Sequence, residues 1–163
     1  MSQISGSGSL GWTLAAGVAL CVAVGALAGL STRAAIPGWY ATLIKPSYNP
    51  PNAIFGPVWT ALYMLMGLAA GLIWRQPRSA LRTDALACFA LQLTLNFLWS
   101  LIFFRWHRIG IALAELALLW LAILSTLLWF WQIRPLAAWL MLPYLGWVSF
   151  AAALNAAIFR LNR

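Results

Sequence analysis

Long apolar stretches alternate with short basic segments along the chain. A helix that crosses about 30 Å of hydrocarbon, rising about 1.5 Å per residue, needs about 20 residues. Five apolar stretches reach this length, and a single charged residue, Glu115, lies well inside one of them. The pattern predicts an all-α fold, an integral membrane bundle of five transmembrane helices, with spans at about residues 10–31, 52–74, 81–104, 109–132 and 136–159.

The connections between the spans predict a single domain over residues 1–163. A long, proline-rich connection covers residues 33–51, and we expect it to be ordered, with a short helix near Trp39–Ile44. The other connections are short, which favours antiparallel neighbours in a compact bundle; they cover residues 75–82, 105–108 and 132–135.

The first span has an alternative interpretation as a cleaved signal peptide, since Ala26-Leu27-Ala28 is a small-residue pattern of the kind found at cleavage sites. However, residues 1–10 contain no Lys or Arg, and the apolar run is long for a signal core. We therefore favour a retained helix, preceded by a flexible tail at Ser5–Ser9.

The composition excludes a soluble enzyme and a disordered chain. The chain is 64% hydrophobic and 7% charged, whereas soluble domains carry about 25% charged residues. Ten Lys and Arg residues oppose two acids, Asp84 and Glu115. The basic residues are scattered at the ends of the apolar stretches, where they would meet lipid headgroups, and not clustered as nucleic-acid binding requires. Membrane lipid is therefore an expected partner, and nucleic acid is not.

Polar side chains recur at helical spacing within three of the spans, which indicates the faces that point into the bundle. Each face combines an amide or a hydroxyl with aromatic surface: Gln92, Asn96, Trp99 and Phe103; Trp147, Ala151 and Asn155; Trp59, Tyr63, Met66 and Ala70. Such amides either hydrogen-bond between helices or contact a ligand directly, and both interpretations stay open.

Tryptophans and small residues refine this interpretation. Most of the eleven Trp residues lie near span ends and fit an interfacial belt. Trp59, Trp99, Trp120 and Trp147 lie deeper, and a pocket walled by indoles would suit a planar, largely apolar ligand. Pairs of glycines four residues apart, at 25 and 29 and at 67 and 71, favour packing inside one bundle, and a homodimer stays an alternative.

The chain has little catalytic equipment. No nucleophile triad, phosphate-binding loop or metal-ligand cluster occurs, so no cofactor and no metal are expected. Glu115 has no carboxylate partner, and we expect it to hydrogen-bond to a neighbouring helix in preference to a role as a proton relay or cation site. His107 lies in a short basic connection and is expected to be solvated, not a haem ligand.

Several ordered motifs resemble the tryptophan-rich sensory protein and translocator protein family, also called peripheral-type benzodiazepine receptors. The resemblance covers nearly the whole chain from Trp39 onward. Its motifs are Lys45-Pro46-x-Tyr48-Asn49-Pro50-Pro51, Pro57-x-Trp59-x-x-Leu62-Tyr63-x-x-Met66-Gly67, Gln92-Leu93-x-Leu95-Asn96-x-x-Trp99 and Pro143-Tyr144-x-x-Trp147-x-x-Phe150-Ala151-x-x-Leu154-Asn155.

The resemblance implies a five-helix membrane bundle, often dimeric, that binds porphyrins and related tetrapyrroles. By position, Trp39 and Tyr48 would belong to a lid. The pocket would contain Trp59, Tyr63, Asn96, Trp99, Trp147, Ala151, Leu154 and Asn155. Sterol binding is disfavoured, because the C-terminal stretch Leu154 to Arg160 lacks the tyrosine of the sterol-recognition pattern.

The sequence thus favours a membrane protein that binds porphyrins, such as protoporphyrin IX or haem-like ligands, for transport or stress-linked sensing. One alternative is a light- and oxygen-dependent porphyrin-degrading enzyme, in which Trp59 and Trp147 would act, since they match tryptophans implicated in this reaction in some bacterial members. Another is a non-enzymatic partner in a membrane complex. A bacterial inner membrane is the favoured location, with bacterial and mitochondrial outer membranes as alternatives.

Overall fold

The computed structural model describes residues 5–163, and all the regular structure in this range is helical. The elements are α1 (Ser5–Arg33), α2 (Trp39–Thr42), α3 (Asn52–Trp74), α4 (Ala80–Ser100), the π-helix η1 (Leu101–Arg105), α5 (Ile109–Ile133) and α6 (Pro135–Leu161). Five helical segments in this range are long and apolar enough to cross a membrane, with η1 continuing α4 as one of them. The predicted all-α bundle of five spanning helices is confirmed.

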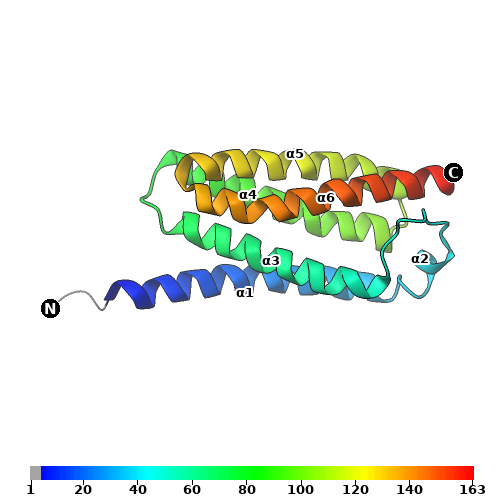
Figure 1. Cartoon of the computed structure of the whole chain (residues 1–163), viewed down its shortest axis with the longest axis horizontal. Helices are drawn as coiled ribbons and strands as arrows, with labels where there is room; N and C mark the ends of the chain where they lie inside the picture. Colours follow the sequence, from blue (N-terminus) through cyan, green and yellow to red (C-terminus); the bar gives the residue numbers. More distant parts are fainter. Residues whose placement is uncertain (1–4) are drawn as a thin grey trace.

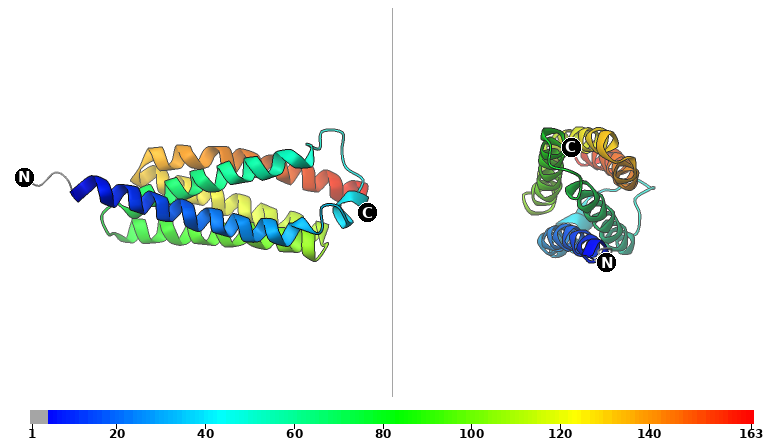
Figure 2. Two further views of the ribbon diagram at one scale, coloured as in Figure 1. Left: turned by 90° about the horizontal axis from the view of Figure 1, so that it is seen from below. Right: turned by 90° about the vertical axis from the view of Figure 1, so that its left-hand side faces the viewer.

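The five long helices run side by side along the long axis of the molecule (Figure 1). α1 packs mainly on α3, whereas α4, α5 and α6 form a second group that α3 joins through α6. The view along the bundle shows this division (Figure 2, right). The segment 34–51, the connection 106–108 and the C-terminus lie together at one end of the bundle, which we call the loop end.

Local sequence signals place the ends of the helices. Pro51 precedes α3, and Pro135 occupies the first turn of α6, where its missing N–H costs nothing. The Ser79 hydroxyl accepts a hydrogen bond from the Arg82 N–H at 3.1 Å and caps α4. α2 confirms the short helix expected near Trp39–Ile44. The flexible tail predicted at Ser5–Ser9 is wrong, since α1 already begins at Ser5: the apolar helix continues into these residues, because each added residue gains a backbone hydrogen bond.

The segment 34–51 is fastened to α6. Asn162 clamps it with two hydrogen bonds: its Oδ1 accepts from the Ile44 N–H at 3.0 Å, and its Nδ2 donates to the Ile44 carbonyl at 2.9 Å. Within the segment, the buried Tyr40 hydroxyl donates to Asn49 Oδ1 at 3.0 Å. Burial raises the pKa of Tyr40 above its ordinary value, and the hydrogen bond to Asn49 opposes this shift. These bonds order the segment 34–51, in which α2 is the one regular element.

α1 and α3 touch backbone to backbone at glycines. A Cβ on Gly67 would lie 2.6 Å from the Gly17 carbonyl oxygen and equally close to the Val18 backbone nitrogen. A Cβ on Gly71 would lie 3.2 Å from the Thr13 carbonyl oxygen. The pair Gly67 and Gly71 therefore packs inside one chain, as the sequence predicts.

We expect Gly67→Ala to lower the stability of the bundle. The added methyl group meets backbone atoms of α1, which cannot rotate away, and overpacking of this kind costs about 1–3 kcal/mol. The matched control is Gly146→Ala on α6, whose Cβ would meet nothing within 4 Å. Thermal unfolding in detergent should show a lower midpoint for Gly67→Ala and an unchanged or higher one for Gly146→Ala. Equal midpoints would contradict the close contact between α1 and α3.

Candidate ligand-binding cavity

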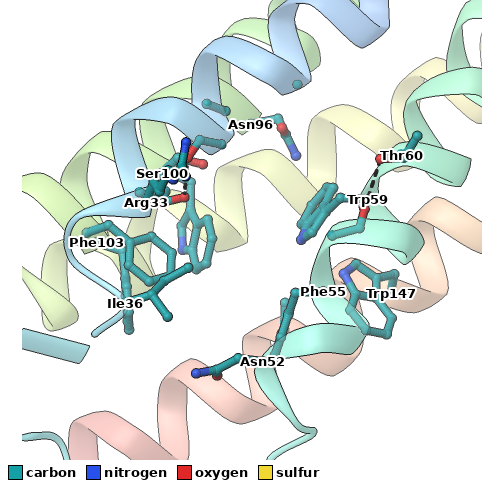
Figure 3. Close-up of a pocket in the computed structure, with 18 of the residues that line it drawn as sticks. Arg33, Ile36, Asn52, Phe55, Trp59, Thr60, Asn96, Ser100, Phe103 and Trp147 are labelled. Atoms are coloured by element: carbon teal, nitrogen blue, oxygen red, sulfur yellow. Dashed lines mark hydrogen bonds between the residues drawn. The ribbon is translucent and has the colours of Figure 1, made fainter. Parts of the chain in front are cut away.

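A cavity of about 660 Å³ lies in the half of the bundle next to the loop end. Volumes of about 300–1,000 Å³ are typical of small-molecule sites. Its wall is formed by α1, α3, α4, η1 and α6, and Ile36 and Tyr40 line it on the side of the loop. Figure 3 shows labelled side chains from these elements arranged around the open space.

Aromatic rings form much of the wall, and they brace one another. Trp147 meets Phe55 edge-on with the ring centroids 5.9 Å apart, and Trp59 meets Tyr63 at 5.8 Å. On the α4 side, Trp99 stacks on the ring that follows it one turn later, Phe103, at 5.3 Å. The rings are therefore held in place before any ligand enters, and they present two aromatic walls.

Four of the residues that α1 contributes to the cavity wall are small: Gly25, Ala26, Ala28 and Gly29. A Cβ on Gly25 would collide with the ring of Tyr63, so this glycine makes room for an aromatic wall residue. A Cβ on Gly29 would meet nothing within 4 Å, so this position borders empty space. Gly56 on α3 likewise lines the cavity and has nothing within 4 Å of an added Cβ.

Two hydrogen-bonded networks join the helices around the cavity. The Tyr63 hydroxyl donates to Asn96 Oδ1, and Asn96 Nδ2 donates to the Tyr144 hydroxyl at 3.0 Å. Trp99 Nε1 donates to Asn155 Oδ1 at 3.3 Å, and Asn155 Nδ2 donates to the Ile109 carbonyl at 3.0 Å. Both amides thus hydrogen-bond between helices while they line the cavity, which supports the packing interpretation for these two residues.

The structure brings eight of the ten candidate site residues together on the cavity wall. They are Trp59, Tyr63, Asn96, Trp99, Trp147, Ala151, Leu154 and Asn155. Trp39 and Tyr48 lie outside the wall. Trp39 stacks on His107 with the ring centroids 4.2 Å apart, and the Tyr48 side chain is half exposed, with its hydroxyl 3.5 Å from the Ala153 carbonyl oxygen.

Sequence reasoning missed a second set of wall residues. Tyr40, adjacent to Trp39 in the same short helix, reaches the cavity where Trp39 does not. The α1 wall was missed entirely, although its run of Gly and Ala was a usable signal. Arg33, at the end of α1, also lines the cavity. His107 is exposed, as predicted for a solvated loop residue.

The hydrogen bond predicted for Glu115 is wrong. Both carboxyl oxygens are buried and have no hydrogen-bond partner among the described residues. Gln92 likewise lacks hydrogen-bond partners, since both polar atoms of its buried amide are unpaired within residues 5–163.

Comparison with known proteins agrees with this architecture. The profile of the TspO/MBR family matches residues 17–161. The tryptophan-rich protein TspO of Chlorobaculum tepidum is 40% identical over 92% of this chain and 96% of its own length. The translocator protein of Homo sapiens is 40% identical over 76% of this chain and 75% of its own length. The tryptophan-rich sensory protein of Cereibacter sphaeroides is 41% identical over 76% of this chain and 77% of its own length.

We expect Glu115→Leu to stabilise the bundle, because it removes a buried carboxyl group that has no hydrogen-bond partner within residues 5–163. An unsatisfied buried polar group costs about 1–3 kcal/mol. The contrasting variant is Asn155→Leu, which removes two hydrogen bonds and leaves Trp99 Nε1 unpaired. Thermal unfolding in detergent should show a rise for Glu115→Leu and a fall for Asn155→Leu. A fall for Glu115→Leu would mean that its carboxyl group makes a stabilising contact.

Proposed function

We propose that this protein binds a porphyrin or a related tetrapyrrole inside the membrane, for transport or stress-linked sensing. The premise is its family: the chain belongs to the TspO/MBR family. Its five apolar helices and its family make it a multi-pass membrane protein. The observation that carries the proposal is the cavity of about 660 Å³ between two aromatic walls.

The chemistry of the wall favours a flat, apolar ligand. Trp59 and Trp147 lie on one side of the space, and Ser100 and Phe103 lie on the other (Figure 3). Aromatic rings in contact with a planar ring system contribute about 0.5–1.5 kcal/mol each beyond the area that they bury. Because the amides of Asn96 and Asn155 already hydrogen-bond to the protein, recognition would depend on shape and stacking more than on hydrogen bonds.

A second candidate function is light-dependent breakdown of the bound porphyrin. It is favoured by the position of Trp59 and Trp147, whose side chains both line the cavity. The carboxylates Asp84 and Glu115 and the imidazole of His107 are absent from the described wall. Any reaction would therefore draw on the excited ligand, oxygen and indole oxidation, with the protein supplying orientation.

We further propose a bacterial cell membrane as the location. The match with the Chlorobaculum tepidum protein over nearly the whole length of both chains supports this assignment. A homodimer and a role in a larger membrane complex remain predictions of the sequence.

Protoporphyrin IX should quench the tryptophan fluorescence of the purified protein saturably, and filling the cavity should weaken this binding. Gly29→Leu adds a side chain that points into empty space, so the protein should still fold while its affinity falls about tenfold or more, in line with loss of buried contact area. Gly146→Leu is the control, because Gly146 has equal room for a side chain but lies away from the cavity. Unsaturable quenching of the wild-type protein would reject porphyrin binding and favour the role in a membrane complex.

Under light and oxygen, the second candidate function predicts that bound porphyrin loses its absorbance faster than porphyrin in detergent alone, and that a discrete product forms. Trp59→Phe and Trp147→Phe should slow this loss, because they remove the indoles next to the ligand. Trp120→Phe, on α5 and outside the described cavity wall, should leave the rate unchanged. Equal rates with and without protein would reject the degradative reaction and leave binding intact.

A further inference from the structure

The cavity contains one charged side chain. Among the described residues of its wall, only Arg33 carries a charge. Arg33 is the last residue of α1 and lies where the cavity reaches the loop end. In the view of Figure 3 it lies across the space from Trp59 and Trp147. The cavity is therefore apolar and aromatic in its depth and cationic at its mouth.

No acidic residue neutralises this end of the bundle. The chain has two acids: Asp84 lies in α4 near the opposite end, and Glu115 is buried inside α5. Six of the ten basic residues belong to the loop end: Arg33, Lys45, Arg105, Arg108, Arg160 and Arg163. The Arg33 side chain is exposed, and within residues 5–163 its guanidinium has no hydrogen-bond or ion-pair partner, so its donors are free for a ligand.

The distance along α1 suits a ligand with one apolar part and one charged edge. Wall residues of α1 extend from Val22 to Arg33, which corresponds to about 16 Å at 1.5 Å per residue. A planar ring system placed beside the tryptophans would thus reach from the hydrocarbon depth toward the membrane surface. A carboxylate at its outer edge would meet the guanidinium, whose planar fork of N–H donors pairs with both carboxylate oxygens.

We propose that Arg33 is a specificity-determining residue that selects planar ligands with a carboxylate edge and orients that edge toward the loop end. This inference rests on the proposed function. A basic residue at the end of a membrane helix ordinarily meets a lipid phosphate. Arg33 differs from the other loop-end bases because it lines the cavity, whereas Arg105, at the end of η1, does not.

The test compares protoporphyrin IX with its dimethyl ester, which has the same macrocycle without the two negative charges. Both are titrated against the protein in an uncharged detergent, which removes lipid phosphates. The wild-type protein should bind the free acid about tenfold or more tightly than the ester, the effect of a charge-assisted hydrogen bond. Arg33→Gln should lose this preference while its affinity for the ester stays within about twofold, because stacking is untouched. Arg33→Lys should keep part of the preference, since the charge remains without the fork.

The matched control is Arg105→Gln, which removes a charge from the same end but not from the cavity wall. It should keep the preference for the free acid. Equal wild-type affinities for acid and ester would overturn the role of Arg33 and leave porphyrin binding standing. Equal losses in Arg33→Gln and Arg105→Gln would also overturn it, because the preference would then come from the general field of the loop end. Binding of neither compound would overturn both proposals.

Discussion

The backbone contact between α1 and α3 is the constraint on which the cavity depends. At Gly17 and Gly67 the two helices meet with no room for a Cβ. One step nearer the loop end, Gly25 faces the ring of Tyr63, and at Gly29 an added Cβ would touch nothing. Along α1, Gly17 thus faces the backbone of α3, Gly25 faces an aromatic ring, and Gly29 faces open space. The cavity begins where the backbone contact between α1 and α3 ends, with the Tyr63 ring against Gly25 at its inner limit.

The helices that form the other walls are joined by hydrogen bonds between polar side chains. An unpaired amide or hydroxyl in hydrocarbon costs free energy, so pairing across helices is strongly favoured. Asn96 joins α4 to α3 through Tyr63 and to α6 through Tyr144, and Asn155 joins α6 to α4 and α5. These bonds fix the spacing between α3, α4 and α6, and the aromatic rings of the wall lie between these helices. The exceptions among the described residues, Gln92 and Glu115, lie outside the cavity wall.

Hydrophobic length and helical periodicity explain what could be predicted from the sequence. Apolar runs identify the five spans because the bilayer thickness sets helix length, and the polar stripes place Asn96, Trp99, Trp147 and Asn155 on one interior surface. α1 has no such polar stripe, and its run of small residues is the one feature of its sequence that marks the cavity side. The segment 34–51 has no period at all: whether Trp39 or its neighbour Tyr40 reaches the cavity depends on long-range bonds such as Asn162 to Ile44.

The position of Arg33, the one charged residue of the described cavity wall, links helix packing to the proposed ligand selectivity. Arg33 belongs to α1, and α1 is placed against the rest of the bundle mainly by α3. The glycine contact therefore determines how far the guanidinium lies from the tryptophans on α3 and α6. On the proposed function, ligands are distinguished by their outline and by the charge at their edge, because the described wall provides ring faces and one positive charge but no carboxyl or imidazole group. A change at Gly67, distant from any ligand, would then alter selectivity as well as stability, because it would shift the charged mouth relative to the aromatic depth.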